Sequence, residues 1–293
     1  MRRPAPIFLL FLLILTLPVL LSAEPEKQKN ASVQLLAYDQ IVQPGQRVSL
    51  RGRLLSQSIM FRNRPVSGER VEFLLDGKSL GVNLTGGDGI AVREVEALPL
   101  GEHSVTIRLK SAQYEGPEAK ARVSVWSLVQ PILIINLAAA VKEKEGEGPS
   151  LLEPRFDLDP RRDAVRVLKA LAEEYHLLFF TDQGESRLSE IKSWLASQNF
   201  PPAPLLVWKI GEGPVSHTLG LGEEMESLRS AGWTNLKIGI GATSLDAEPF
   251  LKIGLKTIIL VDDQEDAMEM PAGAVKATSW KKVEQMMKKI LGP

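Results

Sequence analysis

Apolar and polar residues alternate with a period of two in the first part of the chain. Between residues 33 and 126, short segments place an apolar side chain at every second position, which is typical of strands that bury one face. Turn-forming residues such as QPGQ (43–46) and GGDG (86–89) separate these segments. We predict strands at residues 48–54, 71–77, 90–95, 103–109 and 119–126. About seven short strands at this spacing favour a β-sandwich.

Beyond residue 126 the pattern changes to continuous apolar runs that alternate with amphipathic segments. The runs predict buried strands at residues 132–137, 176–181, 204–208, 236–241 and 257–261. The segments between and after them predict helices at residues 163–175, 186–198, 221–232, 245–254 and 279–291, the last of which is basic. Strands that are apolar on both faces and alternate with helices form a parallel sheet covered on both sides. Ligands of such sheets bind at the carboxyl ends of the strands.

The first residues have the pattern of a secretory signal peptide. Arg2 and Arg3 precede an apolar run at residues 7–21, and a small residue, Ala23, ends the segment before the charged sequence EPEKQK. The run is shorter than the roughly 20 residues needed to span a bilayer, and Pro18 would break its last turns. We therefore expect cleavage after Ala23 and export of the remaining chain. An uncleaved signal anchor is the alternative.

Composition narrows the classes of function. The chain has 293 residues, of which 44% are hydrophobic and 24% charged, which suits about two domains. A net charge of −1, without a basic stripe that includes aromatic residues, argues against a nucleic-acid partner. The absence of cysteine excludes disulfides, thiolate metal sites and lipid attachment at a cysteine. An exported chain of this kind fits a bacterial envelope, in the periplasm or outside the cell.

Four segments follow from these patterns. We expect a signal peptide at residues 1–23, a linker at 24–32, a β-sandwich at 33–126 and an α/β domain at 127–293. No transmembrane segment is expected after signal cleavage.

The expected sandwich resembles bacterial immunoglobulin-like domains. PGQRVSL (44–50), PVSGERVEFLLDGKSLG (65–81), TGGDGIAVREV (85–95) and GEHSVTIRL (101–109) follow one another in the order of the strands and hairpins of those domains. The resemblance implies a spacer or a contact surface and no chemistry of its own. We interpret Arg51 and Arg53 as charged residues on a solvated sheet face. His103 is expected in a turn before a strand.

The second part of the chain resembles the haloacid dehalogenase-like superfamily. The resemblance covers about residues 130–265 and is carried by FFTDQGE (179–185), NFPPAPLLV (199–207) and GATSLDAEPFLKIGL (241–255). The branch that it resembles most is that of the lipin-type and related phosphatidate phosphatases. The resemblance implies a Rossmann-like sheet with helices on both faces and an active site at the carboxyl ends of its strands.

In that superfamily, an Asp at the end of the first strand attacks phosphorus, and a second Asp two residues later acts as acid and base. A Ser or Thr after the second strand binds phosphoryl oxygens, and acidic residues after the fourth strand hold Mg²⁺ with the nucleophile. On this chain, the nucleophile position falls on Asn136 and the acid/base position on Ala138. Thr181 and Asp246 match the pattern, whereas Ala242 replaces the acidic residue that follows the glycine. The resemblance therefore implies a catalytically degenerate site.

Several polar residues remain as candidates for binding a ligand at this site. They are Asn136, Thr181, Asp182, His217 and Asp246. His217 stands near the position of a lysine that balances charge in the superfamily, and no lysine occurs between Lys209 and Lys237. We expect no cofactor and no metal. If the chain were active, Mg²⁺ would be held by Asp246 together with Asp262 and Asp263 at the end of the fifth strand.

One other pair of carboxylates has the right spacing. Asp157 and Asp159 are two residues apart, but no apolar strand precedes them. We interpret Asp159 as the N-cap of a helix with Pro160 at its first position. The segment 142–159 after the first strand is too short for a folded cap, so the site is expected to be open.

The favoured hypothesis is an exported, non-catalytic binding or scaffolding protein with a protein or envelope-surface partner. Loss of the nucleophile alone usually costs several powers of ten in rate, which disfavours an enzyme without excluding one. Two alternatives stay open. The chain could be an active phosphatase for phosphatidate or phosphoprotein, or an adhesion protein whose immunoglobulin-like part makes the contacts.

Overall fold

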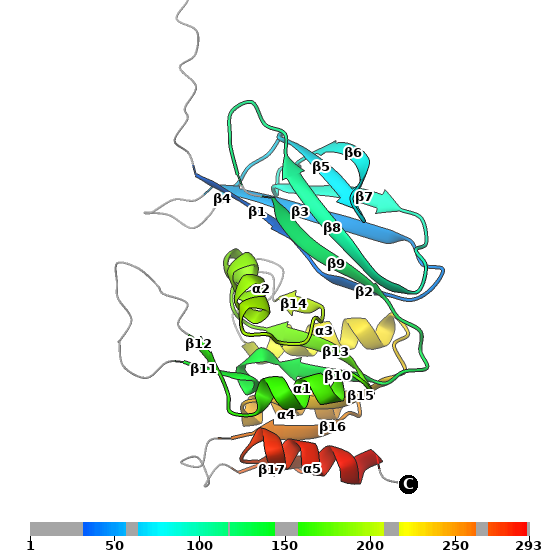
Figure 1. Cartoon of the computed structure of the whole chain (residues 1–293), viewed down its shortest axis with the longest axis vertical. Helices are drawn as coiled ribbons and strands as arrows, with labels where there is room; N and C mark the ends of the chain where they lie inside the picture. The colour runs from blue at the N-terminus through cyan, green and yellow to red at the C-terminus, as the bar shows by residue number, and fades with distance from the viewer. Residues whose placement is uncertain are drawn as a thin grey trace, which may run out of the picture.

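The computed structural model describes residues 32–56, 64–116, 118–143, 158–207, 217–261 and 269–291. These residues form a β-sandwich followed by an α/β unit, which confirms the expected two-part fold class at this level (Figure 1). The expected signal peptide lies outside the described residues. Within the described part of the chain, no helix combines the length and the apolar character needed to cross a membrane.

In the described residues, nine strands form the two sheets of the sandwich. The first sheet contains β1 (Val33–Ala37), β3 (Val48–Ser56), β4 (Arg64–Pro65) and β7 (Ile90–Val95), with β3 paired to the other three. The second has the order β2 (Gln40–Val42), β9 (Ala119–Val125), β8 (Gly101–Leu109), β5 (Arg70–Leu75) and β6 (Lys78–Leu84). Alternate residues of β3 are buried, and Leu50, Leu54, Phe73 and Ile107 meet in one core between the sheets. The period of two in the sequence is thus the inward face of a sandwich.

His103 lies inside β8, so its predicted place in a turn is wrong. Its Nδ1 is 2.8 Å from Asp76 Oδ2 and its Nε2 is 3.0 Å from the Pro99 carbonyl oxygen. Both partners are acceptors, so the ring satisfies them only with a proton on each nitrogen. Burial acts to lower the pKa of His103, but these two bonds outweigh it and raise the pKa above its ordinary value of 6.5. Burial acts to raise the pKa of Asp76, but bonds from His103 and Ser104 outweigh it and lower the pKa.

Six parallel strands form the central sheet of the α/β domain, as far as its residues are described. Their spatial order is β14 (Leu205–Val207), β13 (His176–Thr181), β10 (Ile132–Asn136), β15 (Leu236–Gly241), β16 (Lys256–Leu260) and β17 (Ala274–Ala277). Because the chain runs outward from β10 in one direction and then in the other, the order reverses between β10 and β15. The carboxyl ends of strands at such a switch point form the crevice where ligands of these sheets bind.

Helices cover both faces of this sheet. They are α1 (Ala164–Leu171), α2 (Leu188–Ser197), α3 (His217–Ser230), α4 (Ser244–Lys252) and α5 (Trp280–Leu291). The buried side chains of α1, α2 and α5 share one core cluster with the sheet, and those of α3 share a second cluster with Phe250 of α4. The predicted alternation of strands and helices is confirmed, while β17 was not predicted.

The segment between β10 and α1 differs from its prediction. A 3₁₀ turn, η1 (Leu137–Ala139), follows β10, and β11 (Val141–Glu143) pairs with β12 (Leu158–Pro160) in an antiparallel ribbon. Asp159 and Pro160 therefore belong to a strand, and their assignment to a helix start is wrong. The residue before α1 is Asp163, whose φ of 65° puts it in the left-handed region. Asp157 lies outside the described residues.

The two domains are joined by buried polar contacts as well as by the chain. Asp39, between β1 and β2, accepts hydrogen bonds from the backbone N–H of Arg122 at 2.9 Å and from that of Leu205 at 2.9 Å. The Lys192 ammonium of α2 lies 2.6 Å from the same carboxylate. Burial lowers the pKa of Lys192, and Asp39 acts in the opposite direction. One carboxylate thus links the sandwich to both a strand and a helix of the α/β domain.

A second contact centres on Glu185 of the turn η2 (Glu185–Arg187), which follows β13. The Tyr38 hydroxyl donates to Glu185 Oε2 at 2.6 Å, and the Arg53 guanidinium pairs with Oε1. The Arg53 side chain is only 18% exposed. Its predicted place on a solvated sheet face is therefore wrong, because this arginine faces the other domain.

Candidate functional site

The site predicted at the carboxyl ends of the central strands centres on a contact between Asn136 and Asp246. Asn136 is the last residue of β10, and Asp246 lies in the first turn of α4, which follows β15. The Asn136 amide Nδ2 donates to Asp246 Oδ1 at 2.9 Å. Both residues are 1% exposed. Two residues that are 110 positions apart in sequence thus meet at the switch point of the sheet.

The orientation of the Asn136 amide is set by its other hydrogen bond. Its Oδ1 accepts from the backbone N–H of Ala138 at 3.2 Å, as the N-cap of the turn η1. An oxygen at that position requires the NH₂ group to face Asp246, because an N–H cannot accept. The side chain that replaces the nucleophile therefore presents two protons and no lone pair to Asp246.

Asp246 is also held by the backbone at the start of its own helix. Its Oδ2 accepts from the N–H groups of Ala242 at 2.8 Å and Thr243 at 3.0 Å. The Thr243 N–H belongs to the N-cap of α4 and the Ala242 N–H to the residue before it, so both precede the first turn of the helix. Here the carboxylate of the helix itself occupies them.

Two glycines of β15 allow this close approach of α4. A Cβ on Gly241 would lie 2.5 Å from the Cβ of Asp246, and a Cβ on Gly239 would lie 2.4 Å from the ring of Phe250. Real Cβ atoms do not come this close to other heavy atoms, so any side chain at either position would push α4 away. The sequence GIG is thus explained by packing between a helix and a strand.

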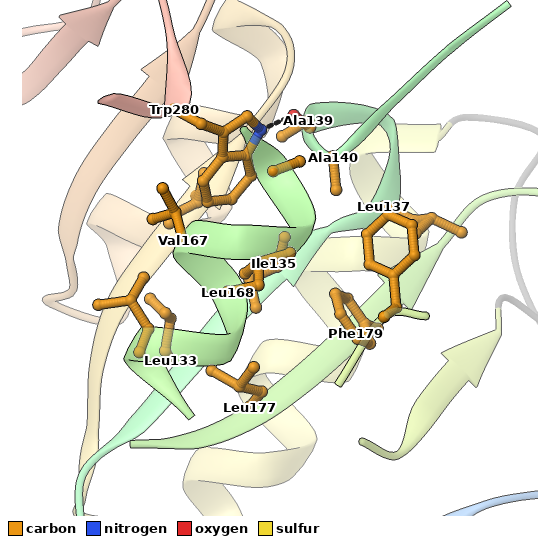
Figure 2. Packing of buried hydrophobic residues seen from close by; sticks show 14 of the residues in the cluster. Leu133, Ile135, Leu137, Ala139, Ala140, Val167, Leu168, Leu177, Phe179 and Trp280 are labelled. Atoms are coloured by element: carbon orange, nitrogen blue, oxygen red, sulfur yellow. Dashed lines mark hydrogen bonds between the residues drawn. The ribbon is translucent and has the colours of Figure 1, made fainter. Parts of the chain in front are cut away.

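The alanines that follow Asn136 have different environments. Ala138, which stands at the acid/base position, is exposed, whereas Ala139 and Ala140 are fully buried. Figure 2 shows the indole of Trp280 beside these two small residues, with its Nε1 donating to the Ala139 carbonyl oxygen at 2.9 Å. Ala139 and Ala140 are therefore small because a tryptophan of the last helix packs on them.

Thr181 is the last residue of β13, the neighbour of β10, and Asp182 follows it. Phe180 pairs in register with Asn136, so Thr181 comes one residue beyond it on the same edge of the sheet. Thr181 is 2% exposed, and its hydroxyl oxygen accepts from the backbone N–H of Gln183 at 3.2 Å. Asp182 is exposed to solvent. The structure places Asn136, Thr181 and Asp246 at this edge of the sheet, and all three are buried.

The structure describes three further candidate site residues only in part or not at all. His217 is the first residue of α3, and its side chain is not among those described. Asp262 and Asp263 lie outside the described residues. Of the other histidines, His103 lies in the sandwich and His176 begins β13 at the opposite edge of the sheet, where its ring stacks on Trp126.

The described side chains do not fit a magnesium ion. Mg²⁺ requires oxygen ligands, and in proteins it is held by one or two carboxylates plus water and substrate oxygens. Asn136 turns its NH₂ group toward Asp246, and three donors already occupy the two oxygens of Asp246. Among the described residues, no three His, Cys, Asp or Glu side chains gather around a point where a metal could bind. Asn136 and Asp246 instead bind each other, and the amide at the end of β10 is not a nucleophilic carboxylate.

The cavities described in the structure lie between the two domains instead. One of about 710 Å³ is lined by residues of β8, β9 and α2 and by the Pro-rich segment before β14, and one of about 250 Å³ adjoins β14 and Glu185. Asp39 lines both. Sequence reasoning missed Asp39, Lys192 and Glu185, because single charged residues carry no signal until the fold brings the two domains together.

No protein-family model matches the sequence, and no curated protein matches it. Among solved structures, the chain is similar to a D,D-heptose bisphosphate phosphatase of the haloacid dehalogenase-like superfamily from B. bronchiseptica, solved with magnesium and phosphate. The identity is 11%, the match covers 55% of this chain and 99% of that one, and the TM-score is 0.40.

The sandwich domain has similar structures of its own. The fibronectin(III)-like modules of Clostridium thermocellum CbhA are 10% identical, with 32% of this chain and 98% of that one covered and a TM-score of 0.23. The CARDB domain of PF1109 from Pyrococcus furiosus is 12% identical, with 32% and 92% covered and a TM-score of 0.24. Values this low show neither common ancestry nor common function. The sheets themselves define the chain as a β-sandwich joined to a parallel α/β domain.

Proposed function

We propose that this chain is an exported, non-catalytic binding or scaffolding protein, in which an immunoglobulin-like domain is fused to a degenerate phosphatase-like domain of the haloacid dehalogenase-like type. The order of strands and the reversal between β10 and β15 support the second assignment. The signal-like pattern of residues 1–23 supports export to the periplasm or the cell exterior. The partner is a protein or an envelope surface.

One observation carries the non-catalytic part of the proposal. Asn136 donates a hydrogen bond to Asp246 where an active phosphatase of this type would use two carboxylates to hold Mg²⁺. The neutral amide gives Asp246 a hydrogen-bond donor at the place where a metal would otherwise supply positive charge. Since both side chains are buried and hydrogen bonded, the arrangement is stable without a ligand.

The test is a hydrolysis assay with the purified chain from Glu24 onward. p-Nitrophenyl phosphate and phosphatidate are offered with Mg²⁺ and with a chelator, and we expect no Mg²⁺-dependent release of product. Robust hydrolysis that Asp246→Ala abolishes would show that the chain is an active phosphatase. The double variant Asn136→Asp, Ala138→Asp restores both carboxylates, and a gain of activity in it would support the ancestry and the loss together.

A further inference from the structure

The helices α1 and α5 present a strongly basic surface that no function proposed so far uses. They pack side by side on one face of the sheet, and α5 lies at the end of the molecule farthest from the sandwich (Figure 1). Seven exposed cationic side chains make up what we call the basic face. They are Arg162, Arg166, Lys169, Lys281, Lys282, Lys288 and Lys289.

Among the described residues, two carboxylates form ion pairs with these cations. Asp163 is approached by Arg162 at 3.9 Å, Arg166 at 3.4 Å and Lys281 at 4.0 Å. Glu284 is approached by Arg166 at 2.9 Å and Lys288 at 3.3 Å. The two acidic side chains are 22% and 24% exposed.

The cations lie above these acids and reach further into solvent. Arg162 is 92% exposed and Lys288 is 75% exposed. Glu173 and Glu174 follow the C-terminal end of α1 and add two negative charges there, so the seven cations still outnumber four nearby carboxylates. A chain with a net charge of −1 thus concentrates a clear excess of positive charge on one surface.

Over residues 280–289, the part of α5 whose side chains the structure describes, the outer side carries no exposed large hydrophobic residue. Trp280, Val283 and Met287 are fully buried in the core of the α/β domain. None of the large hydrophobic side chains found exposed in the described residues belongs to α1 or α5. The described side chains of this helix therefore offer a partner positive charge and no exposed apolar face.

The chemistry of the basic face favours an anionic lipid surface over a folded protein or a nucleic acid. Stable protein interfaces depend on aromatic and apolar hot spots, and single-stranded nucleic acids need aromatic rings for stacking. Five of the seven cations are lysines, which act as mobile, hydrated point charges and need no fixed partner geometry. A layer of lipid phosphates meets such charges without directional constraint.

We propose that the basic face of α1 and α5 binds the surface of a bilayer that contains anionic phospholipids. Bound in this way, the α/β domain lies on the membrane and the sandwich projects away from it (Figure 1). Binding does not depend on whether the site at Asn136 is catalytic, since that site lies at the carboxyl ends of the strands and shares no residue with the basic face.

The test is vesicle sedimentation with the chain from Glu24, which lacks the apolar N-terminal run and retains every described residue. Phosphatidylcholine vesicles are compared with vesicles of which about one third is phosphatidylglycerol. We expect binding to the anionic vesicles alone. Raising the salt from about 0.1 M to about 1 M should abolish it, because the Debye length falls from roughly 10 Å to 3 Å.

Two matched variants locate the contact. Replacement of Lys281, Lys282, Lys288 and Lys289 by Gln should weaken partitioning more than 100-fold, at about fivefold per lysine. The control replaces four exposed lysines elsewhere, Lys78, Lys110, Lys120 and Lys237, by Gln and should change it by less than about threefold. Circular dichroism checks that both variants fold.

Three outcomes would overturn the proposal. They are equal effects of the two variants, equal binding to vesicles without phosphatidylglycerol, and no binding to the anionic vesicles. A duplex DNA probe is tested at the same salt. If only the DNA is bound, and the α5 variant loses it, the basic face serves a nucleic acid instead.

Discussion

Replacing Asn136 with Asp should make the folded protein sensitive to pH and to magnesium. The substitution keeps the shape of the side chain but puts a second carboxyl 2.9 Å from Asp246 Oδ1 in a site that is 1% exposed. At an effective dielectric constant of about 20, two charges at that distance repel by about 6 kcal/mol. The new carboxyl therefore takes up a proton at neutral pH, because protonation costs less than the repulsion.

The free-energy cost of protonating the new carboxyl sets the size of the destabilisation. Holding a carboxyl with an ordinary pKa of about 3.9 protonated at pH 7 costs about 4 kcal/mol, at 1.36 kcal/mol per unit. Once protonated, the Asp can donate to Asp246 as the amide does, so little further loss is expected. The folded-state pKa of the new group is raised, so the destabilisation is absent below the unfolded pKa and grows as the pH rises toward the folded pKa.

The assay is urea unfolding of the wild type and the variant at pH 5 and pH 7 without divalent ions. The difference in unfolding free energy between the two proteins should grow by about 2.7 kcal/mol over this range. Mg²⁺ at 100 times its Kd for the variant should raise the unfolding free energy of Asn136→Asp by about 2.7 kcal/mol and leave that of the wild type unchanged. As a control, Asn136→Leu should lose about 1–3 kcal/mol by leaving buried partners unpaired, independently of Mg²⁺. A loss below about 1 kcal/mol in Asn136→Asp with no pH dependence would refute the contact as the organising feature of the site.

Two further predictions concern the sandwich and its link to the α/β domain. In a double-mutant cycle, Asp39→Asn and Lys192→Met should show a coupling energy of at least about 1.5 kcal/mol in urea unfolding, and additive effects would count against the buried pair. Because the pKa of His103 is raised, its bond to Asp76 is fully present below about pH 6.5 and is lost as the pH rises through the folded pKa. Thermal melts from about pH 6 to pH 9 should therefore show that the unfolding free energy of the wild type declines by up to about 1 kcal/mol, whereas that of His103→Gln does not. Equal pH dependence in the two proteins would contradict this.

The pattern of apolar and polar residues predicted the strands and helices whose buried faces follow a regular sequence period. Strands with one buried face alternate apolar and polar residues, as β3 does, and strands buried on both faces read as continuous apolar runs, as β10 does. The site was predictable to the extent that the carboxyl ends of parallel strands share one edge. That rule placed Asn136, Thr181 and Asp246 together, although no pattern shows which of them touch.

The missed elements are short or lack a clear pattern. β17 has four residues and includes Lys276 at the outer edge of the sheet, so no apolar run marks it. In β12, the pair Asp159 and Pro160 has the chemistry of a helix start, but pairing with β11 decides its conformation. The contact of Arg53 with Glu185 between the domains joins residues 132 positions apart, so no local sequence pattern predicts it.

We expect the carboxylate of Asp39 to hinder pairing between the edge strands of two copies of this protein. β14 is the outermost strand of the parallel sheet on the side of the sandwich, and its free backbone could otherwise pair with a strand of another molecule. Asp39 occupies the Leu205 N–H on that strand, with a lysine beside it. A truncated chain of residues 127–293 would lack Asp39 and expose the Leu205 N–H. The isolated α/β domain should therefore aggregate more readily than the intact chain.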